Sequence, residues 1–211
     1  MEHSLFITKT ISKVMPTITI VACVFLSSGN CFADETIVMI RHGEKPDAGL
    51  GQLNCQGLNR SLALPKVLKQ KFDTPTAIYA PNPGIQKNDR GTLYNYIRPL
   101  ATIEPTAISL GMPVNTQFGL DDIGRLNTAL LSPAYANATI IVAWEHRLAE
   151  EAARNILAMN GGDPATVPTW KGNDFDSIYI VDVKANSNGQ RIASFRLDAQ
   201  GLNHLSTNCN N

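Results

Sequence analysis

Two histidines stand at the ends of apolar runs in this chain of 211 residues. His42 follows the letters "IVMIR", and His146 follows "IIVAWE". Arg41 precedes the first histidine and Gly43 follows it, so a cation, an imidazole and a residue without a side chain stand in a row. Open α/β sheets bind their ligands at the carboxyl ends of neighbouring strands. We therefore expect His42 and His146 to lie in one site.

The residue types around His42 suit a phosphoryl group. A guanidinium supplies positive charge, and Gly43 lets the chain turn and bring backbone N–H groups close to an anion. A neutral imidazole is a good nucleophile toward phosphorus near neutral pH, where it forms a covalent phosphohistidine that water later cleaves. The pattern therefore indicates phosphoryl-transfer chemistry.

Strands and helices must position these residues. The apolar runs Ile37–Ile40 and Ala138–Trp144 predict strands buried on both faces. The pattern between and after them predicts helices at Leu58–Lys71, in part of Leu93–Leu110 with interruptions at Pro99 and Pro105, at Asp121–Leu131 and from Glu145 to Gly162, and short strands at Ala77–Tyr79 and Val114–Thr116.

Two late runs, "SIYIVDV" and "RIASFRL", are joined by "KANSNGQ". Asn188-Gly189 within that link favours a hairpin turn. Strands that alternate with helices, followed by a hairpin, predict an α/β fold. We expect a three-layer α/β/α sandwich with a mostly parallel central sheet and an antiparallel hairpin at one edge.

Charge and composition exclude some classes of function. The chain carries 18 Lys and Arg against 18 Asp and Glu, and it has no basic stripe and no acidic tail. Nucleic acid is therefore not an expected partner. The length after residue 33 suits one domain with a sizeable core.

The first 33 residues have the layout of a secretory signal peptide. Lys9 and Lys13 precede an apolar run from Val14 to Leu26, and small polar residues then lead to "NCFA". The run is shorter than the roughly 20 residues that span a bilayer. We expect cleavage after Ala33, a mature domain over 34–211, a periplasmic or secreted location and no stable membrane association. Two alternatives are a lipoprotein processed at Cys23 and an uncleaved membrane anchor.

Two cysteines remain in the mature domain, Cys55 and Cys209. In an exported protein they could form one disulfide or stay as two free thiols, and the sequence leaves both open. It contains no CxxC motif and no Cys/His pair at zinc spacing. We therefore expect no structural metal, and we expect no cofactor.

The ordered segments "IVMIRHGEK", "LNCQGLNRSLALP", "AIYAP", "YIRPLAT" and "IIVAWEH" resemble the histidine phosphatase superfamily, which includes phosphoglycerate mutases and acid phosphatases. "RHGE" after a strand resembles the signature of that family. Gly57 and Arg60 are in register with its "LTxxGxxRA" segment, Arg98 to Thr102 is similar to "RAxxTA", and His146 stands where a second histidine is expected. The likeness covers nearly the whole mature chain.

The resemblance implies a role for each matched residue. His42 would be the nucleophile, Arg41 and Arg98 would clamp the phosphoryl oxygens, and His146 would donate a hydrogen bond to them during transfer. These side chains would supply the positive field without a metal. Plainer roles stay open, since Arg98 could be a surface helix residue and His146 could cap a helix.

The sequence departs from the family pattern in three places. Lys45 follows "RHGE" where many relatives have Arg or Thr. An insertion of about fifteen residues, "NPGIQKNDRGTLYNY", precedes Arg98 and is expected to overhang the pocket. We expect a solvated loop there, and the alternative is that Lys87 or Arg90 reaches the substrate. The second histidine lies in "WEHR", which leaves the general acid open. Glu145 is the first candidate, and Asp121 or Asp122 is the second.

These observations predict an exported phosphomonoesterase acting on a small phosphate ester or a phosphoprotein. A non-catalytic phosphate or polyanion binder is the alternative from another class. A phosphomutase is a further alternative, which export disfavours because glycolytic substrates are cytosolic.

Overall fold

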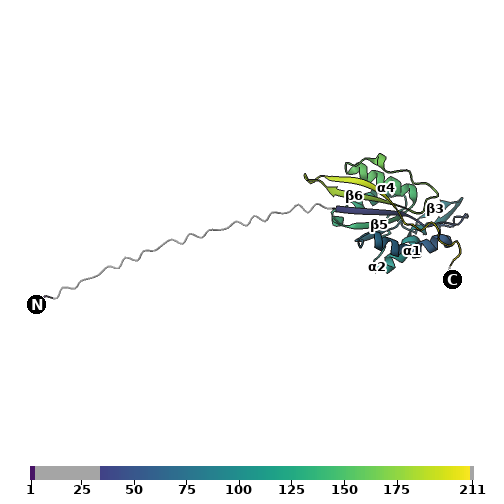
Figure 1. Cartoon of the computed structure of the whole chain (residues 1–211), viewed down its shortest axis with the longest axis horizontal. Coiled ribbons are helices and arrows are strands. Elements are labelled where there is room, and N and C mark those ends of the chain that lie inside the picture. The colour runs from purple at the N-terminus through teal and green to yellow at the C-terminus, as the bar shows by residue number, and fades with distance from the viewer. Residues whose placement is uncertain (3–33, 210–211) are drawn as a thin grey trace. The chain divides into compact units, whose positions relative to one another are not determined.

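A five-stranded sheet with the order β2-β5-β1-β6-β7 forms the centre of the structure (Figure 1). β1 (Asp34–Arg41) pairs in parallel with β5 (Thr139–Trp144), which pairs in parallel with β2 (Ala77–Tyr79). β6 (Ser177–Ala185) is antiparallel to β1, and β7 (Arg191–Ala199) is antiparallel to β6. Four of the five strands therefore point the same way, as the sequence predicted.

The computed structural model describes residues 1–2 and 34–209. The chain divides into two units, Met1–Asn30 and Cys31–Asn211, and all the described helices and strands belong to the second unit. The predicted signal peptide lies outside the described residues, apart from residues 1–2.

Four helices cover the two faces of the sheet. They are α1 (Cys55–Lys71), α2 (Arg98–Leu110), α3 (Ile123–Leu130) and α4 (His146–Met159), and two short 3-10 turns occur at Pro133–Tyr135 and Pro164–Thr166. Figure 1 shows α1 and α2 on one side of the sheet and α4 on the other. The predicted three-layer sandwich is confirmed.

Side chains of β1 alternate between the two hydrophobic cores. Val38 and Ile40 pack in the core that includes residues of α1 and α2, and Ile37 and Met39 pack in the core that includes residues of α3 and α4. All four are fully buried. This explains why β1 is an uninterrupted apolar run rather than an alternating one.

Local signals place the starts of two helices as expected. The Asn54 side chain accepts a hydrogen bond from Gly57 N at 2.9 Å and caps α1. Glu145 caps α4 by accepting from the backbone N–H groups of Arg147 and Leu148. Past the end of α4, Gly161 has a positive φ of 66°, which a glycine adopts without strain.

The segment before α2 was predicted wrongly. β3 (Gln86–Asp89) and β4 (Thr92–Asn95) form a two-stranded antiparallel sheet where a solvated loop and the start of a broken helix were expected. Pro99 does not interrupt α2, because it lies in the first turn, where no backbone N–H is needed. The predicted strand at Val114–Thr116 reduces to one isolated bridge between Tyr79 and Asn115.

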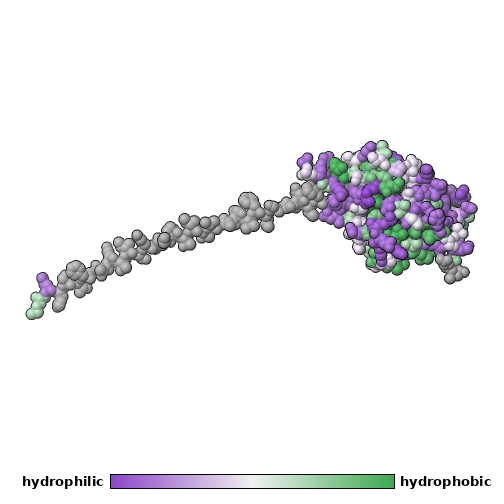
Figure 2. All heavy atoms as spheres, in the orientation of Figure 1, coloured by the Kyte–Doolittle hydropathy of each residue, from purple (hydrophilic) through white to green (hydrophobic). Residues whose placement is uncertain are grey.

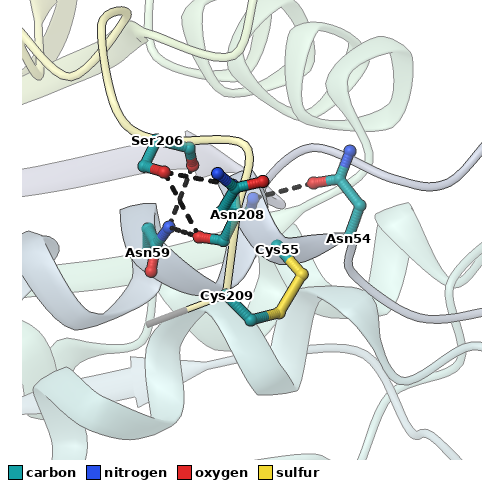
Figure 3. The surroundings of a disulfide bond; sticks show 7 residues. Asn54, Cys55, Asn59, Ser206, Asn208 and Cys209 are labelled. Carbon is teal, nitrogen blue, oxygen red and sulfur yellow. Dashed lines mark hydrogen bonds between the residues drawn. A yellow bond between two sulfur atoms is a disulfide. The ribbon is translucent and has the colours of Figure 1, made fainter. Parts of the chain in front are cut away.

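A disulfide joins Cys55 to Cys209 across a sequence separation of 154 residues (Figure 3). It fastens the segment after β7 to the start of α1. The Asn59 side chain of α1 supports the same attachment by donating hydrogen bonds to the carbonyls of Ser206 and Asn208, at 2.9 and 2.8 Å. Of the two states that the sequence left open for these cysteines, the structure has the bridge.

The surface of the domain mixes hydrophilic and hydrophobic residues, and hydrophilic ones predominate on the side that carries β3 (Figure 2). Within the described residues, no helix has both the length and the apolar character needed to cross a membrane.

Candidate functional site

A cavity of about 210 Å³ opens at the carboxyl ends of β1 and β5. Five of the residues predicted for the site line it: Arg41, His42, Arg98, Glu145 and His146. The rest of its lining is Lys45, Lys87, Asn88, Asp89, Tyr96, Leu120 and Arg147. The structure therefore brings together side chains from β1, β3, α2 and α4 and from the loops that follow β1 and β5.

The parallel pairing of β1 with β5 aligns the two histidines. Arg41 is in register with Trp144, and the backbone N–H of His42 donates to the Trp144 carbonyl at 3.0 Å. This bond continues the ladder by one residue beyond the strands. Glu145 and His146 follow directly, so the two predicted segments meet at one edge of the sheet.

His42 is held as a neutral imidazole. Its Nδ1 lies 2.7 Å from the Gly43 carbonyl, which can only accept, so Nδ1 carries the proton and Nε2 keeps a lone pair. Burial, together with the charges of Arg41 and Arg98, lowers the pKa of His42 to about 3, although the bond to Gly43 opposes this change. At neutral pH the imidazole is therefore available as a nucleophile.

Arg41 supplies a positive charge that no described carboxylate pairs with. Its Nη1 donates to two neutral carbonyls, those of Gly172 and Asp174, at 2.8 and 2.9 Å, and its guanidinium lies over the Phe175 ring at 3.8 Å. Burial lowers the pKa of Arg41 to about 10, which leaves it charged at neutral pH. It is thus fixed in position without being neutralised.

Arg98 is buried at the start of α2, which excludes the surface role left open by the sequence. Its Nη1 contacts Asp89 Oδ2 at 2.5 Å, and its guanidinium lies 4.6 Å from the centre of the Tyr96 ring. Burial alone would raise the pKa of Asp89, but hydrogen bonds from Arg98 and Gly51 lower it. Asp89 is therefore an ionised carboxylate that positions Arg98.

Sequence reasoning missed Asp89 and Tyr96. Both lie in the insertion "NPGIQKNDRGTLYNY", where the family pattern gave no guide. The available signal was an acidic residue nine positions before the expected phosphate-binding arginine. Of the two insertion cations named from the sequence, Lys87 lines the cavity, whereas Arg90 lies exposed in the β3–β4 turn.

Glu145 lies where it was predicted, but its surroundings do not suit a general acid. Its Oε2 accepts from the backbone N–H groups of Arg147 and Leu148, at 3.0 and 3.2 Å. Its Oε1 lies 2.6 Å from His146 Nδ1, a charge contact without good hydrogen-bond angles. Burial alone would raise its pKa, but His146 and the helix N–H groups lower the pKa of Glu145 to about 2. The carboxylate has no proton to give at neutral pH, and it instead positions His146.

The second candidates for the acid are also engaged. Asp121 pairs with Lys87 and lines a neighbouring cavity rather than the one around His42. Asp122 accepts from the Gly119 N–H at 3.0 Å, lies 3.5 Å from Arg125 Nη1 and does not line the His42 cavity. Neither residue contacts His42.

The backbone N–H of Gly43, which was expected to lie close to a bound phosphate, already has a partner in this structure. It donates to Thr102 Oγ1 at 2.8 Å and is not free for a ligand. The glycine is required because a Cβ there would meet the Cα and O atoms of Gly57 at 2.9 Å. Gly43 therefore allows α1 to pack directly against the segment that carries His42.

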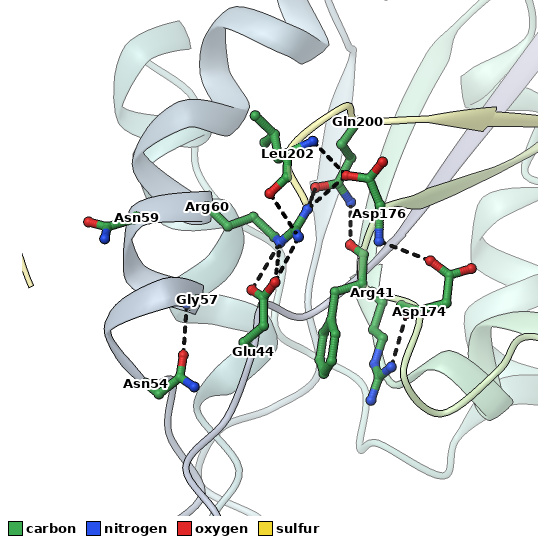
Figure 4. Close-up of polar contacts among 12 residues, drawn as sticks. Arg41, Glu44, Asn54, Gly57, Asn59, Arg60, Asp174, Asp176, Gln200 and Leu202 are labelled. Atoms are coloured by element: carbon green, nitrogen blue, oxygen red, sulfur yellow. Dashed lines mark hydrogen bonds and ion pairs between the residues drawn. The ribbon is translucent and has the colours of Figure 1, made fainter. Parts of the chain in front are cut away.

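A buried ion network around Arg60 holds the segment that carries His42 and Glu44 (Figure 4). The Arg60 guanidinium of α1 contacts Glu44 at 2.7 Å and Asp176 at 3.1 Å. It also donates to the Gln200 side chain and the Leu202 carbonyl, at 2.9 and 3.2 Å. Arg60, which the sequence matched to the family pattern, thus connects Glu44 to the segment that follows β7.

No group of three or more His, Cys, Asp or Glu side chains suited to a metal ion is found among residues 1–2 and 34–209. The lining of the His42 cavity is instead dominated by guanidinium and ammonium groups. Such a lining suits an anion rather than a cation.

No family model matches the chain, and no curated protein matches it in sequence. Solved structures do match it. One is assigned to the phosphohistidine phosphatase SixA of Nakamurella multipartitia, with a TM-score of 0.52 and 14% identity over 78% of this chain and 95% of that one. Another is the phosphoglycerate mutase of Plasmodium falciparum, with a TM-score of 0.51 and 12% identity over 85% of this chain and 98% of that one.

The chain has the α/β fold of these two solved structures. The fold expected from "RHGE" and the segments after it is thereby confirmed. At these identities the likeness does not assign roles to residues. The roles of His42, Arg41, Arg98 and His146 stay predictions.

Proposed function

We propose that the chain is an exported phosphatase that hydrolyses phosphomonoesters through a covalent phosphohistidine at His42. One observation carries the proposal: a neutral, buried imidazole with a lone pair on Nε2 lines a cavity together with the guanidinium groups of Arg41 and Arg98. A phosphoryl group needs this combination of nucleophile and fixed positive charge.

In the proposed reaction, Nε2 of His42 attacks phosphorus and the ester P–O bond breaks. The leaving oxygen departs with the bonding electrons and takes a proton. Water then attacks the phosphorus atom and gives up a proton to solvent. The N–P bond breaks and its electron pair returns to Nε2, which releases inorganic phosphate and restores neutral His42. Arg41 and Arg98 stabilise the equatorial oxygens, and His146 donates a hydrogen bond to them.

The geometry limits which group can donate a proton to the leaving oxygen. Both carboxylates lining the cavity, Asp89 and Glu145, are held ionised by positive partners. We infer that solvent supplies this proton, and that leaving groups of low pKa react faster than alkoxides.

Export is supported by the Cys55–Cys209 disulfide, which is typical of a protein from an oxidising compartment. N-terminal sequencing of the secreted or periplasmic protein should give Asp34 as the first residue. A protein that begins at Met1, or one with a lipid on Cys23, would contradict this part of the proposal.

The central test uses p-nitrophenyl phosphate with the mature protein in EDTA. We expect turnover without added metal, and a loss of several powers of ten in His42→Ala because the covalent route has no substitute. His204→Ala is the matched control, since His204 is exposed and does not line the cavity. An active His42→Ala overturns the proposal, and phosphate binding without turnover by the wild type would favour the non-catalytic binder.

A further inference from the structure

A second hollow lies beside the His42 cavity and shares part of its wall. Lys87, Leu120, Glu145 and Arg147 line both, and Asp121 and Leu148 line only the second. The two hollows thus adjoin each other at Lys87 and Arg147. A substituent of a substrate whose phosphoryl group faces His42 would lie close to these two cations.

The lining of the His42 cavity carries more positive charge than one phosphoryl group requires. Five cations line it, which are Arg41, Lys45, Lys87, Arg98 and Arg147, against the two carboxylates Asp89 and Glu145. Arg41 and Arg98 suffice to clamp a phosphoryl group at His42. Lys45 lies 3.6 Å from Asp89, so that cation is partly balanced. Lys87 and Arg147 remain as positive charge at the rim.

The present partners of these two cations can be exchanged for a ligand at little cost. Lys87 pairs with Asp121, whose side chain is 69% exposed. Arg147 has an 81% exposed side chain, and its Nε lies 3.5 Å from Glu145, a carboxylate already bound by two backbone N–H groups and close to His146. An ion pair with one strongly exposed member is weak, because water screens the attraction between the charges.

Both cations stand on elements that are fixed to the phosphate site. Lys87 lies on β3, two residues before Asp89, which pairs with Arg98 in a buried contact. Arg147 follows His146 in the first turn of α4. Their backbones are therefore held close to the reacting centre while their charged ends stay free to move.

We propose that Lys87 and Arg147 form a subsite for a second anionic group, a carboxylate or a phosphate, on the phosphomonoester substrate. This inference rests on the proposed phosphatase function and narrows its substrate class to molecules with two anionic groups. The second group would replace Asp121 as the partner of Lys87.

The test compares aryl phosphates that differ in one charge. The probes are 4-carboxyphenyl phosphate, its neutral relative 4-carbamoylphenyl phosphate, and 1,4-phenylene bisphosphate. We expect wild-type kcat/KM to favour the anionic probes by about tenfold or more, the size of one charge-assisted hydrogen bond. The larger of the two anionic preferences tells whether carboxylate or phosphate fits better. The preference should shrink as salt is added.

Variants that remove one positive charge show whether Lys87 and Arg147 cause the preference for anionic probes. Lys87→Gln and Arg147→Gln should each lower the ratio of anionic to neutral kcat/KM, the double variant should bring it close to one, and Lys87→Arg should retain it. Arg90→Gln is the matched control, because Arg90 is on the same hairpin but lines neither hollow.

The outcomes separate the two proposals. A wild type that hydrolyses none of the probes refutes the phosphatase function itself. A wild type that hydrolyses all of them without preference refutes the subsite alone. An anionic preference that Lys87→Gln and Arg147→Gln leave unchanged also refutes the subsite, because the selectivity would then arise elsewhere.

Discussion

The disulfide between Cys55 and Cys209 should contribute a large part of the stability of the domain. It closes a loop with a sequence separation of 154 residues. Chain-entropy arguments assign about 5 kcal/mol to a loop of that length, because the bridge limits the unfolded chain. Domains are typically stable by about 5–15 kcal/mol, so its removal should bring the protein close to unfolding.

Urea unfolding of wild type and a Cys55→Ser, Cys209→Ser double variant measures this difference. Both sulfur positions are at least partly exposed, so serine leaves no cavity and the change reports on the unfolded chain. We expect the free energy of unfolding to fall by about 5 kcal/mol and the m-value to rise, because the unbridged chain exposes more surface.

Two controls belong to the experiment. Wild type in reductant should match the double variant, and the double variant should not respond to reductant. A difference below about 1 kcal/mol would refute the reasoning, since it would mean that the unfolded chain keeps these ends close without the bridge.

Three other predictions follow from the described side chains. Because the pKa of His42 is lowered to about 3, nitrogen NMR should show an Nδ1-protonated neutral ring at pH 5, and titration near pH 6.5 would contradict its burial. Burial, opposed by Arg191, raises the pKa of Glu35 to about 7. The folded state then keeps a proton that the unfolded chain loses above about pH 4.5, so the free energy of unfolding should decline as pH rises from 5 to 7. Urea unfolding across that range should show a weaker decline in Glu35→Gln, and equal slopes would contradict the assignment. Glu145→Gln should slow p-nitrophenyl and alkyl phosphates by similar factors, because the carboxylate positions His146, and a loss confined to the alkyl ester would restore Glu145 as the acid.

Much of the site could be predicted from sequence because its backbone is set by short-range signals. The strands before His42 and His146 are apolar runs, and their buried parallel pairing brings the two histidines to one edge of the sheet. The helix predicted at Leu58–Lys71 is α1, which begins three residues earlier, after its Asn54 cap. Signals of this kind depend on residues close together in the chain.

The features that sequence reasoning missed depend on contacts between distant segments. The β3–β4 hairpin is polar and mostly exposed, so it has no alternating pattern to reveal it. The role of Gly43 follows from its contact with Gly57, and that of Asp89 from its contact with Arg98. The ionisation of Glu145 depends on helix N–H groups whose direction is known only once α4 is placed.

The partners of Arg60 come from opposite ends of the domain, so its ion network can form only late in synthesis. Glu44, two residues after His42, is synthesised early, whereas Gln200 and Leu202 are synthesised after every strand of the sheet. The Cys55–Cys209 bond imposes the same order, because one partner must wait for the other. Residues of β1 and α1 therefore leave the ribosome long before Arg60 can make its contacts with Gln200 and Leu202. The loop that carries His42 and Glu44 is therefore fully supported only after the segment that follows β7 has packed against α1.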